Sequence, residues 1–138
     1  MICHKVSISP FPCPRPRINR KTGGVYYPKS YMDWRKVGAV LLQLEGLEAI
    51  TDKDTPIELW VDFYLKGVIA KEHTSKPDLD NLLKAFMDLL VDSGLLPDDA
   101  QVQSIKAGKH HLSAGKTPYI TFGYKPTEIY YNQQSNEE

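Results

Sequence analysis

The chain has 138 residues, of which 41% are hydrophobic and 25% are charged, as expected for one ordinary globular domain. It contains no run of about 20 apolar residues, and its first residues lack the apolar core of a secretory signal. We therefore expect a single cytoplasmic domain over residues 1–138 with no membrane partner. Two cysteines are too few for a secreted disulfide scaffold, so we expect reduced thiols, although Cys3 beside His4 leaves a zinc site as an alternative.

The net charge is zero, but the charges are unevenly distributed. Residues 1–36 carry eight basic residues and one acid, whereas the rest of the chain carries nine basic and sixteen acidic residues. Basic segments attract phosphate backbones, and clustered acids attract divalent cations. Charges of both signs can also simply solvate loops, so this distribution alone leaves both interpretations open.

The front of the chain combines one short strand with a long basic loop. Alternation of Val6 and Ile8 with polar neighbours predicts a strand over residues 4–9. Five prolines and a glycine pair then exclude regular structure from residues 10–28. Residues 1–27 are thus expected to hold a strand and a basic, proline-rich loop. The basic residues of this loop are Arg15, Arg17, Arg20 and Lys21.

The middle of the chain contains the clearest periodicities. Apolar residues at a spacing near 3.6 predict a helix over residues 30–49, which Gly38 and Gly46 weaken slightly. Five alternating apolar residues from Ile57 to Leu65 predict a long central strand. Residues 68–77 are read as a connector.

The remaining segments complete an α+β fold. An amphipathic pattern predicts a helix over residues 80–92, and residues 100–111 and 118–124 are read as two further strands that form a hairpin. A polar tail is expected over residues 125–138. The fold class is therefore α+β, with a mixed sheet of about four strands and two main helices.

Acidic pairs flank the second predicted helix. Asp78 and Asp80 bracket Leu79, so an extended backbone at Asp78 would point both carboxylates to one side. Asp98 and Asp99 follow the helix and could return to its start only if residues 93–99 ran back nearly straight. Failing that, the acids could meet between two subunits.

Three converging carboxylates imply either a bound cation or raised pKa values, and oxygen ligands without histidine select Mg²⁺ or Mn²⁺. Such an ion beside Lys84, one turn after Asp80, suits phosphodiester cleavage. The simpler interpretation is that Asp80 and Asn81 cap the helix, Lys84 and Asp88 form a solvated pair, and the later acids are turn residues.

The stretch "DLDNLLKAFMDLL…GLLPDDAQV" resembles the signature of the RusA family of Holliday-junction resolvases. The shared features are D-x-D-N, a lysine four residues after the second aspartate, an apolar helix and D-D-x-Q-V. The family's element order also matches nearly the whole chain. One departure is Pro77, which stands where the family often has a basic residue, with Lys76 one position earlier.

The resemblance implies a homodimeric, Mg²⁺-dependent endonuclease, with Mn²⁺ as a possible substitute, that resolves four-way DNA junctions by paired symmetric nicks. It assigns catalysis to Asp78, Asp80, Asp99 and Lys84, and the metal to the three aspartates. The expected DNA-binding residues are Arg15, Arg17, Arg20, Lys21 and Lys76. A nuclease of flaps or forks, and a non-catalytic DNA-binding module, remain as alternatives.

Overall fold

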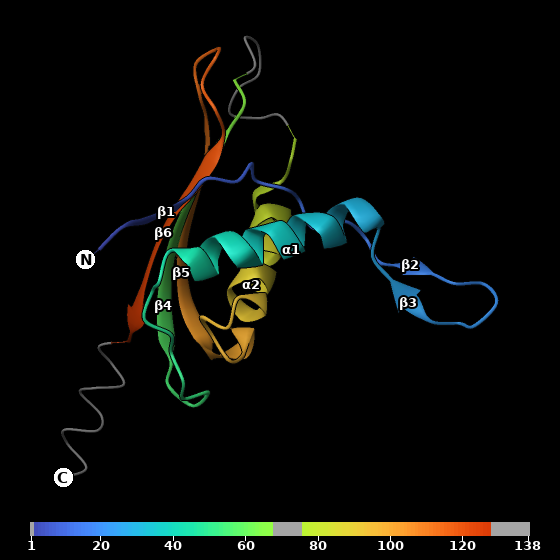
Figure 1. Cartoon of the computed structure of the whole chain (residues 1–138), viewed down its shortest axis with the longest axis horizontal. Helices are drawn as coiled ribbons and strands as arrows, with labels where there is room; N and C mark the ends of the chain where they lie inside the picture. The colour runs from blue at the N-terminus through green and yellow to red at the C-terminus, as the bar shows by residue number, and fades with distance from the viewer. Residues whose placement is uncertain (1, 68–75, 128–138) are drawn as a thin grey trace.

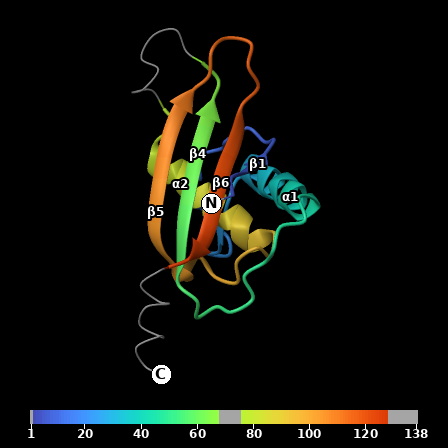
Figure 2. The same cartoon turned by 90° about the vertical axis from the view of Figure 1, so that its left-hand side faces the viewer.

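The computed structural model describes residues 2–67 and 76–127, which form a four-stranded sheet with two helices on one face (Figures 1 and 2). The strands are β1 (His4–Val6), β4 (Ile57–Leu65), β5 (Val102–His111) and β6 (Tyr119–Pro126). Their order is β1-β6-β4-β5, with β4 and β5 parallel and the other neighbours antiparallel. The predicted α+β fold with a mixed sheet is confirmed.

Strand β4 forms the centre of the sheet and has the predicted alternation. Every second side chain from Ile57 to Leu65 is buried, and those between are half-buried on the other face. Because successive side chains in a strand point to opposite faces, the buried set meets the helices. The chain's hydrophobic core therefore lies between β4 and the two helices.

The helices are α1 (Lys29–Leu44) and α2 (Leu79–Asp92). Five residues of α2, from Leu82 to Leu90, are buried at helical spacing, so this helix packs one apolar face on the sheet. Where α1 meets α2, Gly38 lies against Leu89: a Cβ atom at Gly38 would be 2.7 Å from a methyl group of Leu89. Gly38 thus allows close approach of the two helices.

Two predictions are wrong: the end of the first helix and the pairing of the last two strands. Helix α1 ends at Leu44 instead of residue 49, because Gly46 adopts a positive φ of 65° that terminates it. The predicted β5–β6 hairpin does not form, since β4 lies between these strands and pairs with both. Strand β5 instead pairs in parallel with β4. The short connection between β5 and β6 had favoured a hairpin and gave no sign of this long-range pairing.

The proline-rich segment also contains more structure than predicted. Strands β2 (Arg17–Ile18) and β3 (Val25–Tyr26) form a short antiparallel ribbon that projects beyond the start of α1 (Figure 1). The side chain of Asn19 organises its turn by accepting hydrogen bonds from the backbone N–H groups of Lys21 (2.9 Å) and Thr22 (3.4 Å). This β2–β3 ribbon exposes both apolar and basic side chains.

The ends of the predicted segments can be placed only in part. Strand β6 continues to Pro126, so it includes the first two residues assigned to the polar tail. The rest of that tail after Thr127, and most of the connector over 68–77, lie outside the described residues. Within the described ranges, neither helix is long and apolar enough to cross a membrane.

Candidate active site

Two carboxylates are presented at the start of α2, as the D-x-D spacing predicts. Asp78 is extended (φ −71°, ψ 143°) and occupies the N-cap position, yet its side chain makes no capping hydrogen bond. Its Oδ2 lies 3.2 Å from Nζ of Lys76 instead. Asp80 lies in the first helical turn, and both carboxylates are exposed while Leu79 packs against the core. Asp80 is therefore inside the helix and not at its N-cap position, but its Oδ1 does accept a hydrogen bond from the backbone N–H of Asn81 (2.9 Å).

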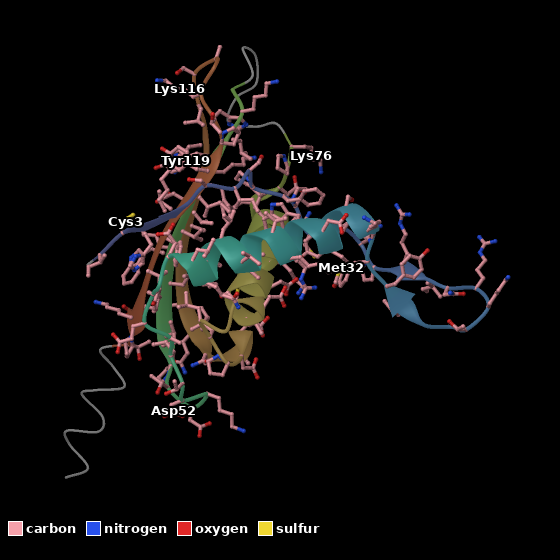
Figure 3. All side chains as sticks on the ribbon, in the orientation of Figure 1. Cys3, Met32, Asp52, Lys76, Lys116 and Tyr119 are labelled. Carbon is pink, nitrogen blue, oxygen red and sulfur yellow. The ribbon has the colours of Figure 1, made fainter. Side chains whose placement is uncertain are left out.

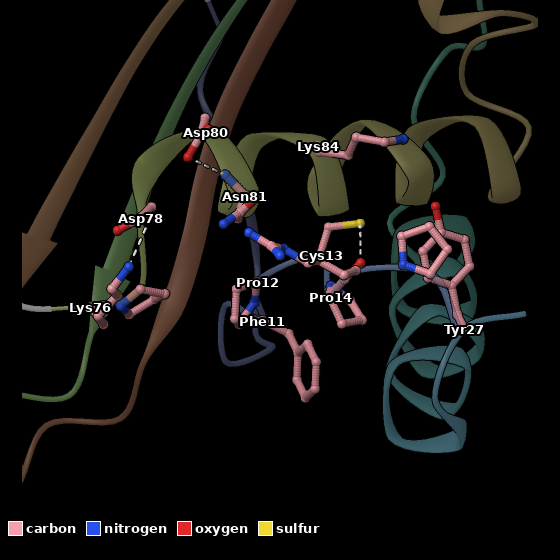
Figure 4. A pocket seen from close by; sticks show the side chains of 13 residues that line it. Phe11, Pro12, Cys13, Pro14, Tyr27, Lys76, Asp78, Asp80, Asn81 and Lys84 are labelled. Carbon is pink, nitrogen blue, oxygen red and sulfur yellow. Dashed lines mark hydrogen bonds and ion pairs between the residues drawn. The ribbon is translucent and has the colours of Figure 1, made fainter. Parts of the chain in front are cut away.

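These acids face a groove of about 1010 Å³ between the start of α2 and the proline-rich segment 11–16 (Figure 4). The two walls are joined where the backbone N–H of Cys13 donates to the carbonyl oxygen of Asn81 (2.9 Å). Charged residues of both signs line the groove: Arg15, Lys76, Asp78, Asp80 and Lys84. A groove with this charge arrangement can hold a hard cation together with a phosphate group.

Lys84 lies one turn after Asp80, and its ammonium is 3.5 Å from Oδ1 of Asp88. Burial lowers the pKa of Lys84, but Asp88, Cys13 and Tyr27 together outweigh burial, so the pKa is raised above that of an ordinary lysine. The predicted Lys84–Asp88 pair is present. It is not simply solvated, because the side chain of Asp88 is only 16% exposed.

Asp88 also contacts a residue that the sequence did not indicate. Its Oδ2 accepts a 2.6 Å hydrogen bond from the hydroxyl of Tyr31, which lies 57 residues earlier in α1 and is fully buried. Arg35, one turn later in α1, places Nη1 4.0 Å from Asp88 and binds both oxygens of Asp92 at 2.7 and 2.8 Å. The available signal was the spacing of Tyr31 and Arg35, which places both on one helical face.

The second acidic pair lies at the other end of α2. Asp98 caps the short 3₁₀ helix η1 (Asp99–Gln101): its Oδ1 accepts from the N–H of Ala100 (2.9 Å), and its own N–H donates to the Gln101 side chain (3.2 Å). The Gln101 amide donates to the carbonyl oxygens of Asp52 (3.1 Å) and Thr55 (3.0 Å). In Figure 3, Asp52 lies near the bottom of the view and Lys76 in its upper part.

The distance between the two acidic pairs follows from the elements that separate them. Helix α2 has 14 residues, which corresponds to about 21 Å. Strand β5 runs back in the direction opposite to α2. It begins at Val102, beside η1, and only at Lys109 does it reach the start of α2, where Nζ of Lys109 donates to the carbonyl oxygen of Pro77 (3.1 Å). Within the described residues, no three histidine, cysteine or acidic side chains are grouped to hold a metal.

Residues 93–99 do not make the straight return that a site within one chain would require. The backbone N–H groups of Leu95 and Leu96 both bond to the carbonyl oxygen of Leu90, and the two leucines are 6% and 2% exposed. Burial of these side chains holds the chain at the end of α2. Asp98 and Asp99 therefore remain there, and the expected meeting with Asp78 and Asp80 does not occur within one chain.

The predicted DNA-binding residues divide into two groups. Arg15 and Lys76 line the groove, whereas Arg17, Arg20 and Lys21 lie on the β2–β3 ribbon. The ribbon cations are exposed, and so are the apolar side chains of Ile18 (68%) and Val25 (67%). Cations thus surround the acidic groove and extend outward along a projecting arm.

Comparison with known families places most of the chain in one of them. Residues 7–121 match the family model described as endodeoxyribonuclease RusA. The matched range includes the groove, α2 and η1, and therefore all four predicted catalytic residues. No individual curated protein matches the chain.

Proposed function

The chain belongs to the RusA family of endodeoxyribonucleases, and we propose that the groove at the start of α2 is the site where it cuts DNA. The family resolves Holliday junctions, so the chain is a crossover junction endodeoxyribonuclease, a hydrolase acting on branched DNA. One observation carries the assignment of the site: Asp78, Asp80 and Lys84 line the same groove within the matched residues.

The donors in this groove suit a hard divalent cation. Asp78 and Asp80 are exposed. Asp78 makes no capping hydrogen bond, and Asp80 uses Oδ1 to accept from the backbone N–H of Asn81 (2.9 Å), so each carboxylate keeps an oxygen that can act as a ligand. Mg²⁺ is commonly held by one or two carboxylates together with water and substrate phosphate. When bound there, Mg²⁺ would polarise the phosphate and lower the pKa of a water molecule.

The cations of the groove have the complementary role. The Lys84 ammonium would contact the charge that develops on the phosphate during cleavage, and Arg15 and Lys76 would hold the DNA backbone. Their placement around two acids favours a phosphodiester as substrate over a purely apolar ligand. The ribbon residues Arg17, Arg20 and Lys21 would extend the same contact along a junction arm.

Asp99 would join this site from a second copy of the chain. In one chain it lies a helix length from Asp78 and Asp80, whereas a two-fold dimer can place η1 of one copy beside the groove of the other. Such a homodimer has two equivalent sites, which matches the two opposing strands of a four-way junction. Each site then contains residues of both subunits.

The activity is tested with synthetic DNA substrates. We expect paired nicks in a four-way junction with Mg²⁺ and none with EDTA. Cutting of flaps or forks with intact four-way junctions would contradict the proposed paired nicking of junctions. Binding without cutting in either Mg²⁺ or Mn²⁺ would contradict the proposed chemistry and leave a binding module.

The shared site is tested by mixing two inactive variants, Asp80→Asn and Asp99→Asn. If Asp99 acts on the partner's groove, a mixed dimer has one site with both changes and one intact site. About half of randomly mixed dimers are of this kind, so a cruciform plasmid should be nicked but not linearised. If each site draws Asp99 from its own chain, both sites of every mixed dimer carry a change and no nicking returns.

A further inference from the structure

The carboxylate of Asp88 links the groove lysine to the buried interface of the two helices. One oxygen, Oδ1, lies 3.5 Å from Nζ of Lys84, and the other accepts the 2.6 Å hydrogen bond from Tyr31. Lys84 is 55% exposed on its side chain, whereas Tyr31 is fully buried. If Lys84 and Asp88 were simply a solvated surface pair, the Asp88 carboxylate would not need a hydrogen bond from a buried tyrosine hydroxyl.

Tyr31 is itself held in place, so it fixes the position of Asp88. Its ring packs against three other rings, Tyr27, Phe11 and Trp34, with centroid separations of 5.3, 5.9 and 6.0 Å. Burial, followed by Asp88 and Cys13, raises the pKa of Tyr31, so its hydroxyl stays protonated and continues to donate. With one oxygen of Asp88 held by Tyr31, its other oxygen is directed toward Lys84.

The environment of Lys84 makes such a fixed partner important. A lysine side chain is a point charge on a flexible stem, so an exposed ammonium has many positions unless a partner selects one. The groups that face it are Asp88 on its own helix, Cys13 on the proline-rich segment and Tyr27 after β3. Asp88 is the carboxylate among these three, and it is the one that hydrogen-bonds to Lys84.

We propose that Asp88 is a positioning residue that holds the ammonium of Lys84 at the wall of the groove, with Tyr31 as its buried anchor. This inference rests on the proposed function, in which Lys84 contacts the phosphate. Asp88 does not touch the DNA in this role. It limits where the lysine charge can be when the substrate arrives.

The test compares Asp88→Asn with a matched control, Asp92→Asn. Asparagine at 88 can still accept from Tyr31 but has lost its charge toward Lys84. Asp92 lies one turn later and forms its hydrogen bonds with Arg35. We expect Asp88→Asn to lower kcat for junction nicking between about tenfold and a hundredfold with little change in KM, and Asp92→Asn to leave both near wild type. Equal losses in the two variants would overturn the proposal.

A pH profile separates positioning from general damage. The raised pKa of Lys84 keeps its ammonium charged to higher pH than in an ordinary lysine, and Asp88 supports that state. In Asp88→Asn the pKa of Lys84 should fall, so the alkaline limb of the nicking rate should move to lower pH. An unmoved alkaline limb would contradict the proposal.

A second measurement does not require DNA cleavage. In ¹³C-labelled protein, the Lys84 Cε resonance, assigned with Lys84→Arg, reports the pKa of the amine directly. It should titrate at lower pH in Asp88→Asn than in wild type and be unchanged in Asp92→Asn. If wild type fails to cut junctions, the proposed function fails, but this titration still decides whether Asp88 controls Lys84. An unchanged Lys84 titration in Asp88→Asn would refute the coupling even in an active enzyme.

Discussion

The starts of α2 and η1 have the same backbone arrangement, but their first aspartates have different roles. At both α2 and η1, an extended aspartate precedes the first helical residue. At η1 the side chain of Asp98 completes a capping box with Gln101. At α2 the side chain of Asp78 makes no capping hydrogen bond and lies in the groove beside Asp80.

This difference separates an acid that maintains structure from an acid that is available for a ligand. A capping aspartate typically stabilises a helix by about 1 kcal/mol, and α2 is formed without that contribution. A second carboxylate in the first turn, that of Asp80, adds like-charge repulsion, which the helix dipole, nearby cations and the backbone N–H of Asn81 offset. Acids kept in such a place are typical of a site that receives a cation.

The largest expected effect is on nicking, which should depend on the acids at the start of α2 and not on the cap of η1. Asp78→Asn or Asp80→Asn should reduce Mg²⁺-dependent nicking by at least about a hundredfold, because each removes a proposed metal ligand. Junction binding should be kept or become tighter, since each change also removes a charge that repels phosphate. Asp98→Asn is the control, because asparagine also caps helices. A loss of nicking in Asp98→Asn equal to that in Asp80→Asn would remove the distinction.

A smaller effect is expected when cations are changed instead of acids. Replacing Arg17, Arg20 and Lys21 on the β2–β3 ribbon by alanine should weaken junction binding about tenfold or more at moderate salt. The slope of log affinity against log salt should become shallower by about 0.9 for each phosphate group that the protein no longer neutralises. Gel-shift titrations at several salt concentrations measure both. If affinity and slope stay as in wild type, the ribbon does not bind DNA.

The smallest effect is on stability, and here the change at Asp98 should matter more than the change at Asp78. Asp98→Ala removes the side-chain acceptor that caps η1 and should lower the free energy of unfolding by about 1 kcal/mol. Asp78→Ala removes no capping bond, so its effect should stay within about 0.5 kcal/mol. Urea unfolding at one fixed protein concentration compares the two. Destabilisation by Asp78→Ala that matches Asp98→Ala would mean that Asp78 also has a structural role.

Local patterns predicted the parts of the fold that depend on local interactions. The alternation from Ile57 to Leu65 and the apolar face of α2 depend on side chains close in sequence, and both were predicted. The pairing of β5 with β4 was not, because α2 and η1 separate these strands and nothing in either strand specifies its neighbour. Proximity in sequence favoured a hairpin with β6 instead.

The same limit applies to the candidate site. Asp78, Asp80 and Lys84 lie close in sequence at the start of α2, so their spacing predicted that they lie near one another, and all three line one groove. The position of Asp99 depends on Leu95 and Leu96, whose burial holds the chain at the end of α2. The expected return of residues 93–99 was judged from the length of the extended chain alone, and this did not include the free energy of burying two leucines. Tyr31 was missed because its partner is 57 residues away.

The contact of Gly38 with Leu89 sets how closely the two helices lie, and Tyr31 is two turns earlier on the same helix as Gly38. A methyl group at position 38 would act as a wedge. It would push apart the surfaces on which the Tyr31 hydroxyl reaches Asp88, and Lys84 would lose its support without any change in the groove itself. The tuning of the lysine thus depends on a side chain that consists of one hydrogen atom.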